Sequence, residues 1–129
     1  MTRPPTSRPA LLVVGHGTKS AEGCAEFAEL VDLTQLREPW ADVAGGFLEL
    51  APPPIQVAVA RLVEAGHRTV DVVPLVLVAA GHSKGDIPAA LEREERRHPG
   101  LSFRYGRPLG SHPDLLAVAE RRLEEQVPR

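Results

Sequence analysis

The first apolar run of the sequence is ALLVVGHGT, residues 10–18, in which five apolar residues precede a glycine-flanked histidine. A short continuous run of this kind is typical of a strand buried on both faces, as the strands of a parallel sheet are. Ser20 can then cap a helix in which Phe27 and Val31 recur at helical spacing until Pro39 ends the pattern. The segment therefore predicts a strand, a loop and a helix, the opening unit of an α/β domain.

The same alternation continues along the chain. Asp42–Leu48 predicts a second strand, which Gly45 and Gly46 weaken unless they serve a close backbone approach. Consecutive prolines then precede a helix that begins near Ile55, gathers its apolar residues on one face and ends at Gly66.

The second half of the sequence predicts further strands and helices. Its β-branched residues favour a central strand over Thr69–Val78, with Pro74 at a bulge or where its missing donor is harmless. The order βαβαβαβα predicts a four-stranded parallel sheet with helices on both faces, an α/β fold of flavodoxin-like topology. The later elements expected are a helix from Asp86 to about His98 with Pro88 in its first turn, a strand near Ser102–Tyr105, and a last helix opened by Ser111 and Asp114.

Composition narrows the class of protein. The 129 residues suit one domain, and 43% apolar with 25% charged residues is ordinary globular usage. We expect a disordered lead-in over residues 1–9 and a single domain over residues 10–129. The net charge of −2, without a basic stripe, argues against a nucleic-acid or anionic-membrane partner. The single cysteine, Cys24, and the absence of a run of about 20 apolar residues favour a cytoplasmic protein with no membrane span.

Metal-capable side chains follow three of the predicted strands. His16 comes after the first strand, Glu49 after the second and His82 after the third. Ligands of open parallel sheets bind at the carboxyl ends of the strands, so these side chains are predicted to converge on one mouth. Imidazoles together with a carboxylate suit divalent cobalt, iron, nickel or zinc.

Plainer interpretations stay open for these residues. A lone loop histidine is more often a surface residue, although Gly15 and Gly17 leave His16 without shielding neighbours. Glu49 fits a solvated carboxylate at a strand end equally well. The segment from Gly15 to Thr18 could cradle a phosphate, but it lacks the glycine spacing and the lysine of phosphate-binding loops.

The other histidines and the cysteine are predicted to carry no chemistry. His67 and His98 lie in turns away from the predicted mouth, and we expect both to be exposed. His112 is expected to cap the last helix. Cys24 falls on the apolar face of the first helix, where a thiol behaves as a small hydrophobic group.

Five ordered motifs resemble the short form of the class II chelatases, the sirohydrochlorin cobaltochelatase and ferrochelatase group. The resemblance covers nearly everything after Pro9. It implies ATP-independent insertion of cobalt, iron or nickel into sirohydrochlorin or a related tetrapyrrole, on the route to cobalamin, siroheme or a nickel tetrapyrrole. The metal is then a substrate and no nucleotide is needed. The motifs are Gly15-His16-Gly17-Thr18, Phe47-Leu48-Glu49 followed by Pro54, Val73-Pro74-Leu75, Ala80-Gly81-His82 with Asp86-Ile87-Pro88, and Pro108-Leu109-Gly110-Ser111-His112-Pro113.

The resemblance also assigns roles. The two active-site histidines of the family match His16 and His82, which would bind the metal, and its nearby acidic residue matches Glu49. Metal insertion needs a base, because the inner pyrrole protons leave as the metal enters. Histidine, with an ordinary pKa of roughly 6.5, can serve near neutral pH as ligand or proton acceptor, and Glu49 could also accept protons. We expect the carboxylates of the substrate to meet the amino ends of the helices and three loop residues, Thr18, Ser83 and Lys84.

Other functions are compatible with the same residues. A carrier would bind metal or tetrapyrrole through the same histidines without speeding metallation. A flavodoxin-like signalling or nucleotide-binding domain would share the fold, although its phosphate loop is missing. Many relatives join two such halves in one chain, so this chain either pairs with itself or is a fragment of a longer enzyme. We expect a homodimer whose protomers enclose the tetrapyrrole.

Overall fold

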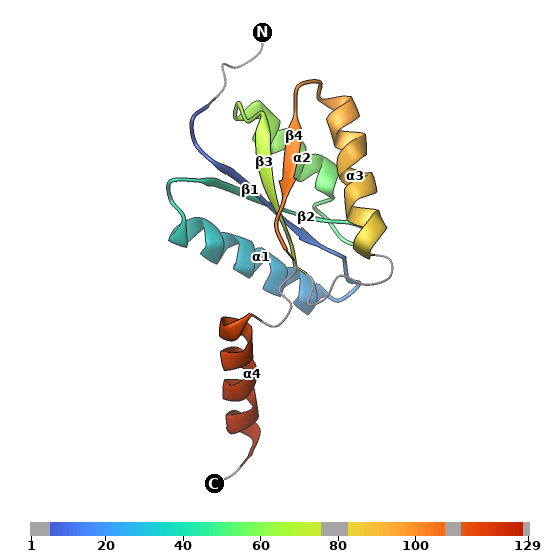
Figure 1. Ribbon diagram of the computed structural model, residues 1–129. Helices are drawn as coiled ribbons and strands as arrows, with labels where there is room; N and C mark the ends of the chain where they lie inside the picture. The colour runs from blue at the N-terminus through green and yellow to red at the C-terminus, as the bar shows by residue number, and fades with distance from the viewer. Residues whose placement is uncertain (1–5, 76–82, 108–111, 128–129) are drawn as a thin grey trace.

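A computed structural model describes residues 6–75, 83–107 and 112–127 of the chain (Figure 1). Its strands form one parallel sheet in the order β2-β1-β3-β4, and helices alternate with them. The predicted fold class is confirmed. The elements in chain order are β1 (Ala10–Gly15), α1 (Ala21–Arg37), β2 (Asp42–Phe47), α2 (Ile55–Glu64), β3 (Thr69–Pro74), α3 (Ser83–Arg97), β4 (Ser102–Tyr105) and α4 (Pro113–Gln126).

The register of the sheet brings the carboxyl ends of three strands to one edge. Gly15, the last residue of β1, is level with Phe47, the last residue of β2. On its other side β1 pairs with β3, and Val14 is level with Pro74, the last residue of that strand. The loops that follow these strands therefore begin side by side, at the edge where parallel sheets bind ligands.

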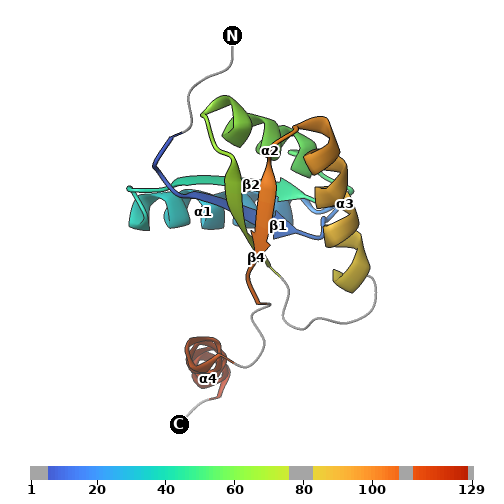
Figure 2. The same ribbon diagram turned by 45° about the horizontal axis from the view of Figure 1, so that its top comes forward.

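β1 supplies apolar side chains to both faces of the sheet, as its continuous apolar run predicts. Leu12 and Val14 are fully buried and belong to the core cluster that includes Val59 of α2 and Leu91 of α3. Val13 points to the opposite face and packs with Phe27 of α1 and Phe47 of β2. Figures 1 and 2 show α1 on one side of the sheet and α2 with α3 on the other. Burial of each such side chain contributes about 1.5–3 kcal/mol.

The glycines of β2 permit helices to approach this strand from both faces. A β-carbon at Gly45 would lie 2.5 Å from Val31 Cγ2 of α1, and one at Gly46 would lie 2.9 Å from Ile55 Cα of α2. Both contacts are closer than real β-carbons allow. The residues that weaken the local strand signal are therefore the ones that make the layered packing possible.

Pro74 ends β3 at a position where its missing N–H costs nothing. The Leu75 N–H donates to Val14 O (2.7 Å), while Val72 O accepts from Gly106 N (2.7 Å). Because successive residues of a parallel strand bond to alternate neighbours, Pro74 turns its nitrogen toward β4, which ends at Tyr105, level with Val72. Residues 76–78 of the predicted strand lie outside the described residues.

The third helix begins earlier than the sequence predicts. α3 starts at Ser83, so Asp86 is not its N-cap and Pro88 lies inside the helix. Asp86 sits in the first turn instead, where a carboxylate is favoured by the partial positive charge of the helix terminus.

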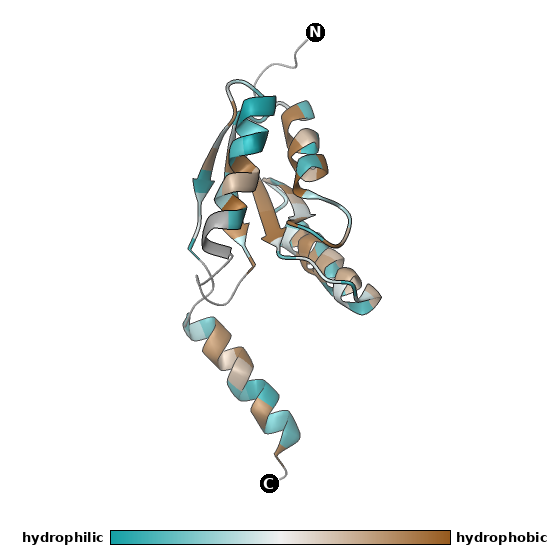
Figure 3. Cartoon of the chain, turned by 90° about the vertical axis from the view of Figure 1, so that its right-hand side faces the viewer, coloured by the Kyte–Doolittle hydropathy of each residue, from teal (hydrophilic) through white to brown (hydrophobic). Residues whose placement is uncertain are grey.

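The last helix has no buried residue and extends away from the sheet (Figures 1 and 3). His112 is its N-cap, because its Nδ1 accepts a hydrogen bond from the Asp114 N–H (3.1 Å). The capping role predicted for His112 is confirmed, whereas Ser111 lies outside the described residues. No helix among the described residues is long and apolar enough to cross a membrane.

His67 is buried, and its predicted exposure is wrong. Its side chain is 2% exposed, and its Nε2 lies 2.7 Å from Asp42 Oδ2. The other carboxylate oxygen of Asp42 accepts from Arg8 Nε (3.1 Å). The N–H of Thr6 donates to Gly66 O (3.2 Å), so residues 6–9 of the expected lead-in make contacts with the domain. The partner of His67 lies 25 residues away in the sequence, which is why the local pattern did not indicate burial.

Candidate functional site

The loops after β1 and β2 are held together by backbone hydrogen bonds. The N–H of Leu48 donates to Gly15 O (2.8 Å), and the N–H of Glu49 donates to His16 O (3.1 Å). These bonds carry the pairing of the two strands past their ends. His16 and Glu49 are therefore neighbours because of the sheet register.

The side chains of these two residues also meet. His16 Nε2 lies 3.1 Å from Glu49 Oε1, and the side chains are 44% and 56% exposed. Because both side chains are exposed, they are accessible to an incoming cation. At such exposure the pair adds little to folding stability. A protonated imidazole would form an ion pair here, and a neutral one with its proton on Nε2 would donate a hydrogen bond.

This arrangement requires glycine at the end of β1, Gly15, and in the loop after it, Gly17. A β-carbon at Gly15 would lie 2.9 Å from Phe27 Cε2 and 3.1 Å from Phe47 Cδ1. Gly17 has φ +127°, and a β-carbon there would overlap the carbonyl oxygen of Glu49. Glycine at these positions lets the loop lie against the aromatic rings on one side and the Glu49 backbone on the other.

A cavity of about 390 Å³ opens beside His16. Thr18, one of the three loop residues expected to meet the substrate, lines this cavity. Its Oγ1 accepts from the N–H of Ser20 (3.1 Å), which leaves the hydroxyl proton to donate elsewhere. Ser20 in turn caps α1 by accepting from Gly23 N (3.1 Å), so the loop and the start of the helix are one hydrogen-bonded unit.

Some residues of the cavity were not singled out from the sequence. Phe27 and Phe47 contribute rings whose centroids lie 4.2 Å apart. Glu26 and Leu30 of α1 complete one wall, and Leu75 contributes from beyond β3. Phe27 recurs at helical spacing in the sequence, but that spacing does not show which residues of α1 line the cavity beside His16.

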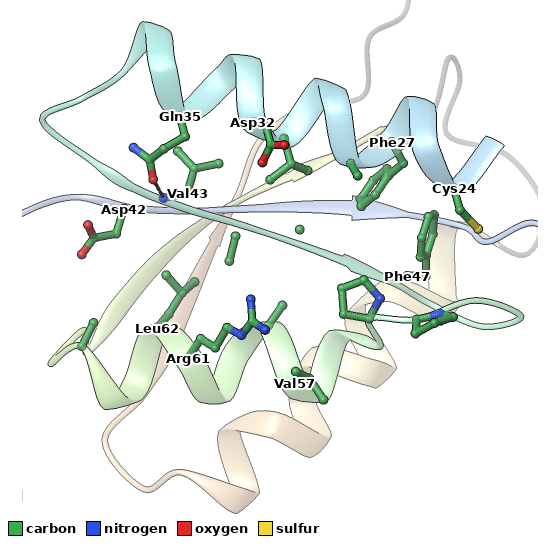
Figure 4. Close-up of a pocket in the computed structure, with 18 residues that line it drawn as sticks. Cys24, Phe27, Asp32, Gln35, Asp42, Val43, Phe47, Val57, Arg61 and Leu62 are labelled. Carbon is green, nitrogen blue, oxygen red and sulfur yellow. Dashed lines mark hydrogen bonds between the residues drawn. The ribbon is translucent and has the colours of Figure 1, made fainter. Parts of the chain in front are cut away.

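A second hollow of about 470 Å³ lies along the free edge of β2, between α1 and α2 (Figure 4). Gln35 closes part of this edge, because its Oε1 accepts from the Val43 N–H (2.9 Å). The lining is mainly apolar, with Asp32 and Arg61 among its charged residues. It contains no histidine, so the cavity beside His16 is the better candidate for metal chemistry.

The third predicted site residue cannot be placed beside this pair, because His82 lies outside the described residues. Ser83 and Lys84 form the start of α3, and their side chains are likewise outside the description. Within residues 6–75, 83–107 and 112–127, no three histidine, cysteine or acidic side chains gather into a metal-binding cluster. His16 and Glu49 form a pair there, with one nitrogen and one carboxylate available to a metal.

Cys24 and His98 are both half-buried in the structure. Cys24 packs with the Phe27 cluster, on the apolar face of α1 where the sequence places it. His98 is half-buried at the end of α3, less exposed than predicted. These features, with the His16–Glu49 pair at the carboxyl edge of a four-stranded parallel sheet, define an α/β domain with an accessible metal-capable site.

Comparison with known proteins identifies the family. The CbiX family model matches residues 10–126, and the chain therefore belongs to the CbiX family. A sirohydrochlorin cobaltochelatase from Sulfurisphaera tokodaii is 32% identical over 115 residues, which cover 89% of this chain and 91% of the relative. A sirohydrochlorin cobaltochelatase from Priestia megaterium is 35% identical over 120 residues, which cover 90% of this chain and 38% of the relative.

A solved structure supports the same assignment. The sirohydrochlorin chelatase SirB from Bacillus subtilis subspecies spizizenii, in complex with cobalt, matches with a TM-score of 0.85 and 30% identity. The match covers 92% of this chain and 50% of that one. The chain thus spans half or less of the length of SirB and of the Priestia relative.

Proposed function

We propose that this chain is a chelatase that inserts a divalent metal, cobalt or iron, into sirohydrochlorin without ATP. The observation that carries the proposal is the accessible His16–Glu49 pair, 3.1 Å apart at the carboxyl edge of the sheet. Family membership supports the substrate, because relatives are named sirohydrochlorin cobaltochelatase and sirohydrochlorin ferrochelatase. Nickel remains a third candidate metal through the class II chelatase resemblance.

The two residues have complementary roles in this proposal. The imidazole of His16, when neutral, offers one nitrogen to the metal and leaves the other coordination positions of the metal open. The ring nitrogens of the substrate then replace water on the metal as the inner pyrrole protons leave. Glu49, beside the imidazole, accepts these protons or holds the ring of His16 in a fixed orientation. Weak attachment suits this reaction, because the metal must pass on to the macrocycle.

His82 is proposed as the second metal ligand. In the sequence His82 follows β3 and directly precedes α3, which begins at Ser83. The end of β3 is level with the end of β1. The carboxylates of the substrate are proposed to meet Thr18, Ser83 and Lys84. The amino end of α3 would add backbone N–H groups to this contact.

The chain is also proposed to act as a homodimer that encloses the tetrapyrrole, in the cytoplasm. The cavity beside His16 is open, and one domain offers only one wall to a large macrocycle. Exposed apolar residues of α4 support self-association, among them Leu116 (52% exposed) and Leu123 (63%). Residues 10–129 are proposed to form the chelatase domain.

The function is tested by anaerobic absorbance assays of sirohydrochlorin with cobalt, iron or nickel, with and without the protein. Faster metallation with catalytic amounts of protein supports a chelatase. Binding of metal or ring in stoichiometric amounts without faster metallation would instead identify a carrier. For the dimer, light scattering at micromolar concentration should give twice the chain mass, and Leu123→Glu should shift it toward the monomer. Gln126→Glu, an exposed change on the same helix, is the matched control.

A further inference from the structure

Leu50, the residue after Glu49, has a backbone conformation that leucine rarely adopts. Its φ is 71°, and it is the only non-glycine residue with positive φ in the described part of the chain. The N–H of Ala51 donates to Glu49 O (2.9 Å), so residues 49–51 form a three-residue turn around Leu50. A γ-turn with positive φ at its centre is rare and strained.

Burial of the leucine side chain does not explain this conformation. The residue is 57% exposed, so its side chain gains little from the core. Glycine or asparagine would occupy such a position with less strain. A strained residue beside a candidate site is grounds for asking what the strain holds in place.

The surroundings of Leu50 show what its conformation fixes. The Glu49 N–H donates to His16 O, and the Glu49 carbonyl accepts from Ala51. That carbonyl and the Leu50 Cβ both lie against Gly17, at the place where a side chain of Gly17 would stand. Both polar backbone groups of Glu49 are thus held, one by the first loop and one by the turn at Leu50. The side chain of Glu49 is then directed at His16 Nε2.

We propose that Leu50 is a positioning residue for Glu49, which acts through its restricted backbone and not through contact with substrate. This inference rests on the proposed role of Glu49 in metallation. A residue with a β-carbon has a narrow range of positive-φ conformations, whereas glycine moves freely over a wide one. Leucine therefore makes the turn stiff, and the stiffness keeps the carboxylate beside the imidazole.

Two substitutions separate the backbone role from a side-chain role. Leu50→Ala keeps the β-carbon and removes the exposed isobutyl group, while Leu50→Gly also frees the backbone. We expect L50A to retain kcat within about twofold, and L50G to lose about tenfold in kcat with KM unchanged, as small misplacements of catalytic groups do. Leu50→Asn, which keeps a β-carbon and tolerates positive φ, should restore most of the activity lost in L50G. Equal losses in L50A and L50G would overturn the proposal in favour of side-chain contact with substrate.

A double-substitution cycle tests whether Leu50 acts through Glu49. In a Glu49→Gln background, L50G should cause little further loss of kcat, because the group that it misplaces is already disabled. The same tenfold loss in both backgrounds would overturn the proposal.

Amide hydrogen exchange of Glu49, followed by NMR in the metal-free protein, gives a readout that does not depend on turnover. Exchange should be about tenfold faster in L50G than in the wild type, because the backbone hydrogen bond from the Glu49 N–H to His16 O opens more often. Exchange should be unchanged in L50A. Unchanged exchange in L50G would overturn the positioning role even if the wild type is an active chelatase. Faster exchange in L50G with an inactive wild type would overturn the chelatase assignment and leave the stiffening role of Leu50 standing.

Discussion

The buried imidazole of His67 lies 2.7 Å from the carboxylate of Asp42, at the edge of the sheet opposite to His16 and Glu49. The two pairs combine the same chemical groups in different surroundings. The His67 side chain is 2% exposed and that of His16 is 44% exposed. Asp42 also binds Arg8, so the His67–Asp42 pair joins the segment before β1, the start of β2 and the turn before β3. The His67–Asp42 pair is structural, whereas the His16–Glu49 pair is open to ligands.

Stability should depend on pH through Asp42. Its hydrogen bond with His67, followed by that with Arg8, lowers the pKa of the carboxyl below its ordinary value of 3.8, although burial acts in the opposite direction. A pKa that is lower in the folded state contributes stability that is complete above the unfolded pKa and is lost as pH falls through the folded pKa. The free energy of unfolding in urea should therefore fall more steeply below about pH 4 in the wild type than in Asp42→Asn. Parallel curves for the two proteins between pH 6 and pH 3 would show that Asp42 does not carry this dependence.

Replacement of His67 should damage the fold and spare the chemistry. His67→Ala removes a buried ring and the hydrogen bond to Asp42, and we expect it to lower the free energy of unfolding by about 1–3 kcal/mol. His98→Ala, at a half-buried position just after α3, is the matched control and should cost less than about 0.5 kcal/mol. Urea unfolding and metallation rates measure both effects at a temperature where both variants are folded. Loss of metallation in folded H67A would contradict the placement of the active site at the edge of the sheet that carries His16 and Glu49.

Gly17 should be essential to the site. Gly17→Ala requires alanine at φ +127° and forces a β-carbon into the Glu49 carbonyl, so the loop must move and separate His16 from Glu49. We expect a fall in stability of more than about 2 kcal/mol and a loss of metallation. Gly100→Ala is the control, because Gly100 also has positive φ (93°) but a β-carbon there meets nothing within 4 Å. It should cost only about 1–2 kcal/mol of backbone strain and leave the metallation rate unchanged. Similar metallation rates in the two variants would refute the requirement for contact between the loops.

Much of the fold could be predicted because its signals are local. The apolar run before His16 predicts a strand buried on both faces, and Leu12 and Val13 do pack on opposite faces of the sheet. The rule for strand ends also anticipates that His16 and Glu49 lie close together, since parallel register carries both residues to one edge.

The features that sequence reasoning missed depend on distant partners or on backbone geometry. His67 looks like an ordinary turn residue until Asp42 and Arg8 are placed around it. Leu50 has no turn signature of its own, and the local sequence does not show that its Cβ lies against Gly17 of another loop. α4 has an amphipathic sequence that suggests packing, yet no residue in it is buried within the chain.

The central prediction concerns metallation by His16, His82 and Glu49. His16→Ala and His82→Ala should each reduce the metallation rate by about 100-fold or more, because each removes a proposed metal ligand or base. The folded state should survive in H16A, since the side chain of His16 is 44% exposed and is not part of the core. Glu49→Gln keeps the shape of the side chain and removes its charge, so it should slow metallation while cobalt affinity changes little, if the carboxylate accepts protons and does not bind the metal.

The measurements for this set are the initial rate of metallation, the affinity for cobalt alone and circular dichroism for each variant. Glu22→Gln, an exposed carboxylate in the first turn of α1, is a matched control for E49Q, because it removes a charge at the same end of the domain without contacting His16. A parallel loss of cobalt affinity and rate in E49Q would make Glu49 a metal ligand, which changes its role from base to coordination. Near-normal turnover in folded H16A or H82A would contradict the paired-histidine mechanism, because it would show that one imidazole is enough for metallation. If E22Q slows metallation as much as E49Q does, negative charge near the cavity, and not the Glu49 carboxylate beside His16, is what the reaction requires.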